Sequence, residues 1–216
     1  MYDALAVLVG YLLGSIPFGY LTARLYGIDD IRKHGSGNIG ATNAWRVAGP
    51  SAGILVTVCD VGKGVLAVVV ASRIGGDVLA VDYVKLIAGM AAIVGHLFPV
   101  SFLFRGGKGV NTALGVMLTL LPIQALIALG VFIMTVALSK YISLGSILGA
   151  SAFFLGVLIT RLTGLSEVHP VYVITTFILA LLIIYAHRSN IKRLLAGNEN
   201  RFNFSSKKHP KAESRV

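Results

Sequence analysis

Charge is scarce in this sequence. Only 13% of its 216 residues are charged, whereas a soluble globular domain has about 25%. Hydrophobic residues make up 56% of the chain, and they gather in runs that approach the roughly 20 residues a helix needs to cross a membrane. The shortage of charge excludes an ordinary soluble domain. It predicts an all-α, polytopic bundle of transmembrane helices.

Cysteine is almost missing as well. Cys59 is the single cysteine, so the chain has no disulfide framework and no cysteine-based metal site. No two histidines have the spacing of a metal site, and we expect neither a metal nor another cofactor. A cleavable signal peptide is not expected either, because the N-terminal apolar run is too long and lacks a basic start.

Seven apolar segments are predicted to cross the membrane. They cover residues 2–24, 50–73, 81–102, 109–121, 123–139, 143–161 and 169–187. The fourth is short, and Pro122 is expected to separate it from the fifth because proline interrupts a helix. An arrangement of six spans that joins these two segments is the main alternative. We expect one membrane domain over residues 1–195 and a basic cytoplasmic tail over residues 196–216.

The basic residues indicate how the chain lies in the membrane. The net charge of +10 is compatible with nucleic-acid binding, but the Lys and Arg residues stand at the ends of apolar runs and in the tail. The predicted outer loops hold only Arg73, Lys85 and Arg161. By the positive-inside rule, the N-terminus lies outside and the C-terminus in the cytoplasm. We therefore expect a lipid bilayer, and no nucleic acid, as the partner of this charge.

A polar loop separates the first two apolar runs, with the sequence HGSGNIGATNAWR at residues 34–46. It satisfies the pattern G-x-G-x-x-G, but a dinucleotide site needs a preceding strand, and here an apolar helix precedes the loop. Glycines still allow backbone N–H groups to converge on an anion, and the start of the next helix would add its dipole. The candidate side-chain donors are Ser36, Asn38, Thr42, Asn43 and Arg46. The alternative is a tight loop in which Gly, Asn and Thr only make turns and caps.

A second glycine-rich loop carries positive charge. Arg105 and Lys108 stand among three glycines, and a helix is predicted to begin just before Thr112. The pattern is again that of an anion cradle. It is not a Walker A motif, because Phe102 occupies the position of that motif's first glycine, so nucleotide hydrolysis is not expected.

The predicted topology places both loops and a third polar cluster on the cytoplasmic face. This cluster is HRSNIKRL at residues 187–194, after the last span. Three polar clusters on one face predict a shared site for an anionic substrate. His187 suits phosphate binding or proton transfer, and its alternative role is to cap the C-terminus of the last span.

Three further ionisable residues lie inside or at the end of predicted spans. Asp60 and Lys63 are three positions apart and so share one helix face. Ions in the membrane usually pair or face a functional site, and for these two residues both readings stay open. His96 either lines the site or is a satisfied histidine at the end of a span.

Some reaction types are excluded by missing motifs. The chain has no nucleophile elbow, no histidine followed five positions later by aspartate as in many glycerolipid acyltransferases, and no evident histidine nucleophile with a paired acid as in a lipid-phosphate phosphatase. A reaction at this site therefore needs a substrate that arrives already activated. It would rely on positioning and electrostatic stabilisation.

Seven motifs follow one another along the chain in the order of a known family. They are GSIPFGYL (14–21), SGNIGATN (36–43), DVGKG (60–64), GHLFPV (95–100), FRGGKGVNTALG (104–115), SLGSI (143–147) and HRSNIKRL (187–194). Together they resemble the bacterial acyl-phosphate:glycerol-3-phosphate acyltransferases, the PlsY family. The resemblance implies an inner-membrane enzyme, usually with seven spans and a cytoplasmic-side active site. Such an enzyme transfers a fatty acyl group from acyl phosphate to the 1-hydroxyl of glycerol 3-phosphate, an early step of bacterial phospholipid synthesis that yields lysophosphatidic acid and phosphate.

The resemblance also implies roles for individual residues. The 36–43 loop would hold the head of the acyl phosphate. The residues expected to hold glycerol 3-phosphate and stabilise charge in catalysis are Ser36, Arg46, Lys108, His187 and Asn190. The expected phosphate-binding residues are Gly37, Asn38, Gly40, Ala41, Thr42, Asn43, Gly107, Gly109 and Thr112. The expected supporting residues are Asp60, Lys63 and His96.

Acyl phosphate is a mixed anhydride, so no acyl-enzyme intermediate is needed, and an upstream acyl-phosphate-forming enzyme is a candidate partner. The alternative function is a small membrane transporter of an anionic solute, because transporters also place helix N-termini at anionic ligands. The location of the cationic groups argues against transport. They gather at one predicted membrane face, whereas a permeation path would place them near the middle of the bilayer.

Overall fold

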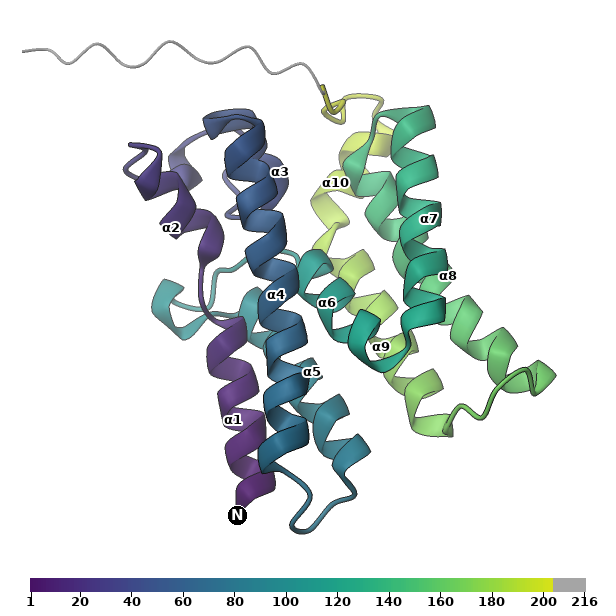
Figure 1. The fold of residues 1–216 in the computed structure, drawn as a ribbon. Helices are drawn as coiled ribbons and strands as arrows, with labels where there is room; N and C mark the ends of the chain where they lie inside the picture. Colours follow the sequence, from purple (N-terminus) through teal and green to yellow (C-terminus); the bar gives the residue numbers. More distant parts are fainter. Residues whose placement is uncertain (204–216) are drawn as a thin grey trace, which may run out of the picture. The chain divides into compact units, whose positions relative to one another are not determined.

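Residues 1–203 are described by a computed structural model, and they form helices and loops with no β-strand among them (Figure 1). The all-α prediction is thereby confirmed. The described chain divides into two compact units, residues 1–116 and residues 117–203. Residues 204–216, the distal part of the predicted tail, lie outside the described residues.

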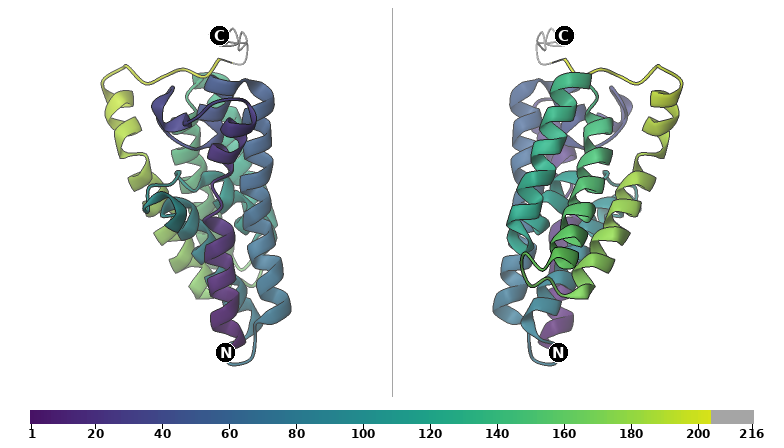
Figure 2. Two further views of the ribbon diagram at one scale, coloured as in Figure 1. Left: turned by 90° about the vertical axis from the view of Figure 1, so that its left-hand side faces the viewer. Right: turned by 90° about the vertical axis from the view of Figure 1, so that its right-hand side faces the viewer.

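Three long helices form the body of the first unit. They are α1 (Tyr2–Gly14), α4 (Pro50–Ile74) and α5 (Val81–Leu97), and they pack against one another, as Figure 2 shows. Glycine permits the close approach of α1 and α5, since a Cβ atom at Gly14 would overlap the carbonyl oxygen of Ala92. Small residues at helix contacts suit a membrane, where close packing rather than the hydrophobic effect holds helices together.

The first predicted span, residues 2–24, is broken into two helices. α1 ends at Gly14 and α2 (Phe18–Leu25) begins three residues later. Pro17 explains the break, because it has no N–H group and disfavours helical backbone at Ile16. The break releases the Ile16 carbonyl from the regular helical ladder. Its oxygen accepts a hydrogen bond of 2.9 Å from Lys63 Nζ on α4.

Short elements between α2 and α4 carry the 36–43 loop. A 3-10 turn, η1 (Ile31–Lys33), precedes the loop, and helix α3 (Ala41–Ala48) begins within its last residues. A second 3-10 turn, η2 (Val100–Phe102), follows α5. A small apolar core fixes the 36–43 loop against α2 and α4. Its buried members are Ala23, Ile31, Ile39, Ala44, Ala52 and Val56.

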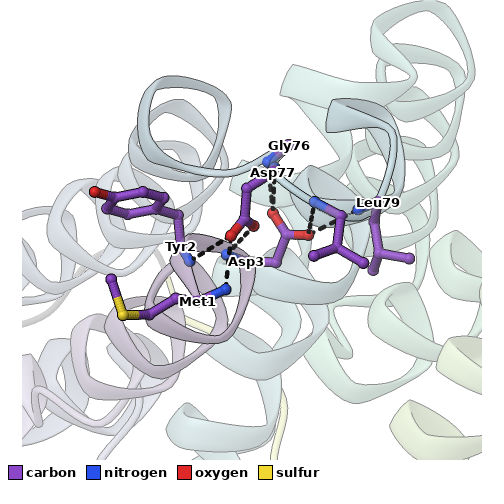
Figure 3. Close-up of polar contacts among 7 residues, drawn as sticks. Met1, Tyr2, Asp3, Gly76, Asp77 and Leu79 are labelled. Carbon is purple, nitrogen blue, oxygen red and sulfur yellow. Dashed lines mark hydrogen bonds and ion pairs between the residues drawn. The ribbon is translucent and has the colours of Figure 1, made fainter.

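Two aspartates join the N-terminus to the turn between α4 and α5 (Figure 3). The Asp77 carboxylate accepts hydrogen bonds from the Met1 ammonium at 2.6 Å and from the backbone N–H groups of Tyr2 and Asp3 at 3.0 Å each. In return, the Asp3 carboxylate accepts hydrogen bonds from the N–H groups of residues 76–79. The N-terminus and this turn therefore lie at the same end of the first unit, as two crossings of a membrane by α1–α2 and α4 require.

The second unit contains four helices. They are α7 (Pro122–Ser139), α8 (Ile142–Thr163), α9 (Pro170–Ala186) and α10 (Arg188–Leu195). α8 packs against both α7 and α9, and α9 and α10 are bent by 60° at His187. Helix α6 (Val110–Leu120) begins in the first unit and ends in the second.

The structure does not confirm the predicted count of seven spans. Five of the described helical segments are long and apolar enough to cross a membrane, or six if the bent pair α9–α10 is one span. The predicted fourth span corresponds to α6, which has 11 residues. At about 1.5 Å per residue, α6 reaches only about half the hydrocarbon thickness of about 30 Å. Pro122 begins α7, so α6 and α7 are separate helices, as the proline predicted.

Asp77→Asn is expected to lower the thermal midpoint of the detergent-solubilised protein at neutral pH. The hydrogen bond from the Met1 ammonium, with those from Asp3 and Tyr2, holds the pKa of Asp77 well below its usual range. Such a carboxyl group stabilises the fold above its unfolded pKa of about 3.9, and the contribution is lost as the pH falls toward the depressed folded pKa. The difference between Asp77→Asn and the wild type should therefore shrink in acid.

Asp82→Asn is the matched control for this measurement. It breaks the Asp82–Lys85 pair of 2.6 Å, in which the Asp82 side chain is 68% exposed. An exposed ion pair contributes little to stability, so the control should leave the midpoint almost unchanged. Equal shifts for the two variants, or a shift for Asp77→Asn that does not depend on pH, would contradict the assigned role of Asp77.

Candidate functional site

Asn43 organises the 36–43 loop. Its side chain is buried, with 1% of the residue exposed. The side-chain oxygen accepts a hydrogen bond of 2.8 Å from the backbone N–H of Ser36. The side-chain nitrogen donates to the carbonyl oxygens of Ile31 (3.3 Å), His34 (3.0 Å) and Asn38 (2.9 Å). Since these contacts occupy the whole amide group, Asn43 shapes the loop rather than offering donors to a ligand.

Other amides of the loop are also used internally. The side-chain oxygen of Asn38 accepts the N–H of Gly40 at 2.8 Å, and the N–H of Gly37 donates to the His34 carbonyl at 3.0 Å. Gly37 has φ +71°, a left-handed conformation that favours glycine. The loop therefore differs from a simple nest in which successive glycine amides point at one anion.

The amides best placed for an anion belong to the first turn of α3. Gly40 precedes the helix, and Ala41 and Thr42 are its first residues. The first N–H groups of a helix have no carbonyl partner within it, and the positive end of the helix dipole favours an anion there. Both residues are half-buried, Ser36 in the same loop is exposed, and Arg46 one turn further along α3 is half-buried.

The 105–109 loop turns back onto the end of α5. The N–H of Gly106 donates to the Leu97 carbonyl and that of Gly107 to the His96 carbonyl, both at 3.0 Å. Two non-glycine residues before the loop, Leu103 and Phe104, have φ of +49° and +60°, which is a strained conformation for such side chains. Lys108 is half-buried and Gly109 is buried.

Phe102 in η2 packs against residues of η1 and α2 that come before the 36–43 loop. The guanidinium of Arg32, which precedes the 36–43 loop, lies 5.0 Å from the centre of the Phe102 ring. Tyr20 on α2 packs edge-on against the same ring, with 4.9 Å between ring centres. Hydrogen bonds from the Arg32 side chain and backbone lower the pKa of Asp30 to about 2, so Arg32 keeps an anionic partner on its other side.

Asp60, Lys63 and His96 form a buried ionic cluster between α4 and α5. They are 2%, 4% and 6% exposed. Lys63 Nζ lies 2.9 Å from Asp60 Oδ1, and His96 Nδ1 lies 3.6 Å from the same oxygen. The Lys63–Asp60 contact is an ion pair, whereas the His96–Asp60 contact is ionic only when the imidazole is protonated. The structure therefore shows the Asp60–Lys63 pairing that the sequence left open. A small pocket beside the cluster is also lined by residues 14–19, Ile39 and Pro99.

Thr112, a predicted phosphate-binding residue, lies inside the protein. It is fully buried where α6 packs on α4, and a Cβ atom at Gly64 of α4 would overlap the Thr112 carbonyl oxygen. Its position suits helix packing at the base of the 105–109 loop.

His187 and Asn190 lie at the junction of α9 and α10 in the second unit, and they are 2% and 6% exposed. The Nδ1 atom of His187 is 2.8 Å from the Ile183 carbonyl oxygen. A carbonyl can only accept, so Nδ1 carries a proton, and in the neutral ring Nε2 is then the acceptor. This contact also caps the end of α9, the alternative role that the sequence suggested.

Glu199 is the residue at this junction that sequence reasoning missed. Its side chain, 5% exposed, accepts hydrogen bonds from Asn190 Nδ2 (2.6 Å), Arg193 Nε (2.6 Å) and Ser143 Oγ (2.9 Å). Burial alone would raise the pKa of Glu199, but these hydrogen bonds outweigh it and hold the pKa below its usual range. Glu199 thus positions Asn190. The sequence contained one signal for this role, namely that Glu199 is a lone acidic residue at the start of a basic tail.

Residues 1–203 contain no group of three or more His, Cys, Asp or Glu side chains that could hold a metal ion.

Comparison with known proteins gives one consistent answer. The sequence pattern of the family described as "Glycerol-3-phosphate acyltransferase" matches residues 4–197. A glycerol-3-phosphate acyltransferase of Trichlorobacter lovleyi is 47% identical over 192 residues, which cover 89% of this chain and 93% of the relative. Another, of Chlorobaculum tepidum, is 42% identical over an alignment of 225 positions, and the alignment covers 93% of this chain and 97% of the relative.

Two solved structures are similar as well. Both are crystal structures of PlsY (YgiH), described as an integral membrane glycerol 3-phosphate acyltransferase, and both are 38% identical to this chain. The glycerol 3-phosphate form has a TM-score of 0.83 and covers 94% of this chain and 96% of its own. The lysophosphatidic acid form has a TM-score of 0.80 and covers 94% and 97%.

Glu199→Ala is expected to destabilise the second unit. The substitution leaves the buried donors of Asn190 and Ser143 without this acceptor, at a cost of about 1–3 kcal/mol for each donor left unsatisfied. The thermal midpoint of the purified protein should fall. Glu167→Ala removes an exposed glutamate of the α8–α9 loop and should leave the midpoint unchanged. A midpoint for Glu199→Ala equal to that of Glu167→Ala would contradict the role given to Glu199.

Proposed function

The chain belongs to the glycerol-3-phosphate acyltransferase family, and we propose that it transfers a fatty acyl group from acyl phosphate to the 1-hydroxyl of glycerol 3-phosphate. The products are lysophosphatidic acid and inorganic phosphate. The observation that carries the proposal is the family match over residues 4–197. The glycine-rich loops of the first unit, each with a half-buried cation nearby, support it because both substrates carry phosphate.

The proposed reaction needs no covalent enzyme intermediate. The glycerol hydroxyl oxygen attacks the carbonyl carbon of the mixed anhydride, the new C–O bond forms, and the bond from that carbon to the phosphate oxygen breaks. Phosphate leaves with the bonding electrons. The hydroxyl proton passes to a base, for which a substrate phosphate oxygen and His187 are the two candidates. The protein's contribution is to position the substrates and to stabilise the developing charge.

We assign the head of acyl phosphate to the 36–43 loop and the start of α3. The N–H groups of Ala41 and Thr42 are the backbone donors in this assignment, and Ser36 and Arg46 are the side-chain donors. Arg46 can bind phosphate through two parallel hydrogen bonds. Asn43 holds the loop in shape for this purpose. Gly37, Asn38 and Gly40 contribute through the fold of the loop.

Glycerol 3-phosphate is assigned to Lys108 of the 105–109 loop. A lysine ammonium acts there as a point charge on phosphate, and Gly107 and Gly109 let the backbone approach closely. His187 and Asn190 are proposed as further contacts on the sequence match alone. The acyl chain is assigned to the apolar faces of the helices, since it must leave the polar head for hydrocarbon.

The membrane setting completes the proposal. We place the protein in the bacterial inner membrane, with its N-terminus outside and its active site on the cytoplasmic side, because Lys and Arg residues concentrate in the loops and tail assigned to that side. The donor would come from an upstream enzyme that forms acyl phosphate.

Arg46→Ala and Lys108→Ala should each lower kcat/KM by about 100-fold, the usual effect of losing one preorganised donor to developing charge. Lys33→Ala is the control, because it removes an exposed cation close to the 36–43 loop that has no assigned role in the site. The initial rate of acyl transfer is measured for each variant. Near-wild-type rates for either Arg46→Ala or Lys108→Ala would show that the residue's assigned role is wrong.

The function itself is tested by phosphate release from a long-chain acyl phosphate by the purified protein. Release should require glycerol 3-phosphate and should match the amount of lysophosphatidic acid formed. Release without the acceptor would indicate a hydrolase. Transfer from an acyl thioester, with none from acyl phosphate, would overturn the proposed donor. No transfer from either donor would favour transport.

A further inference from the structure

We propose that the buried ionic cluster of Asp60, Lys63 and His96 is a positioning device for the 105–109 loop, in which Asp60 orients His96 and His96 holds Gly107 and hence Lys108. The inference rests on the proposed function, because it gives Lys108 a task in substrate binding. It assigns none of the three residues a contact with substrate.

The first observation is that burial of the cluster is costly in free energy. Three ionisable side chains are almost fully buried on helices that cross the membrane, where ions are expensive. A buried ion pair is seldom more stabilising than well-packed apolar residues of similar size. Stability alone therefore does not explain why Asp60, Lys63 and His96 are buried here. A requirement for defined geometry explains it.

The second observation is that His96 contacts Gly107 in two ways. Its backbone carbonyl accepts the N–H of Gly107 at 3.0 Å. Its ring lies against the same residue, since a Cβ atom at Gly107 would overlap Nε2 of His96. The other ring nitrogen, Nδ1, faces Asp60 Oδ1 at 3.6 Å. The imidazole is thus held between the carboxylate on one side and the loop on the other, directly next to the residue that precedes Lys108.

The third observation is that the same cluster reaches the other loop. Lys63 Nζ donates to the Ile16 carbonyl at the break between α1 and α2 and lies 5.6 Å from the centre of the Phe18 ring. One residue further, Gly19 lies against the Ile39 carbonyl of the 36–43 loop, because a Cβ atom there would overlap that oxygen. The cluster therefore contacts the 105–109 loop directly, and it contacts the segment of residues 16–18, whose neighbour Gly19 lies against the 36–43 loop.

The first test compares three substitutions of His96 in the full-length protein. His96→Leu fills the space without a polar contact and leaves the Asp60–Lys63 pair intact, so the fold should persist while kcat/KM falls by about 100-fold, as for a misplaced catalytic group. His96→Asn can donate toward Asp60 from about the position of Nδ1, so it should retain more activity than His96→Leu. His96→Ala should behave like His96→Leu. Most of the loss should appear in KM for glycerol 3-phosphate.

The rate of trypsin cleavage distinguishes a positioning role from a purely structural one. If His96 only stabilised the fold, its loss would not speed cleavage selectively at the 105–109 loop. The 105–109 loop has cleavage sites after Arg105 and Lys108, and the site after Lys33, just before the 36–43 loop, serves as the comparison. Release of the 105–109 loop in His96→Leu should speed cleavage there without speeding cleavage at Lys33. Unchanged kcat/KM, or faster cleavage at all three sites with a matching fall in thermal midpoint, would overturn the proposal.

A double-mutant cycle tests the contact without any enzyme assay. Gly107→Ala should lower the thermal midpoint in the wild type, because its methyl group meets the imidazole. The same substitution in the His96→Ala background should lower it much less, since the space is then open. Additive shifts would overturn the contact. If the wild-type protein transfers no acyl group, the proposed function fails, while the cycle and the cleavage pattern still decide whether His96 positions the loop.

Discussion

Lys63 carries the interaction on which the site of the first unit depends. A lysine inside a membrane span must find partners for its charge and its hydrogen-bond donors. Here Asp60 supplies the charge, at 2.9 Å, and the Ile16 carbonyl, released by Pro17 from the helical ladder, supplies an acceptor at 2.9 Å. Two features that would each be costly in hydrocarbon, a broken helix and a buried cation, thus stabilise each other. The break in turn places α2 and the 36–43 loop beside α4.

The two glycine-rich loops owe their shape to contacts within the protein. Asn43 and Asn38 bind the amides of the 36–43 loop, and the end of α5 binds those of the 105–109 loop. A loop held in this way keeps the proposed donors, the N–H groups of Ala41 and Thr42, in place, so they need no reorganisation when charge develops on a substrate. Such preorganisation suits an activated acyl donor. The reaction then needs a correctly positioned acyl acceptor and a stabilised leaving group, and it needs no nucleophile of the enzyme.

Sequence patterns predicted the helical class, the approximate position of most long helices and the separation of α6 from α7 at Pro122. They also predicted the family, which the comparisons confirm. They did not predict that Pro17 splits the first span, or that α6 is only 11 residues long, because hydropathy measures composition and not where a helix ends. The role of Asn43 was missed because its partners are backbone groups that only the folded loop brings together. The contacts of Glu199 with Ser143 and of His96 with Gly107 join residues far apart in sequence, which periodicity cannot reveal.

The start of α3 is the proposed binding site for the phosphate of an activated lipid. The most direct measurement is an experimental structure of the protein with a non-hydrolysable acyl phosphonate, which keeps the charge and the chain of the proposed donor. We expect the phosphonate oxygens to accept hydrogen bonds from the N–H groups of Ala41 and Thr42 and to contact Arg46. A phosphonate bound away from both the 36–43 loop and the start of α3 would contradict this proposal.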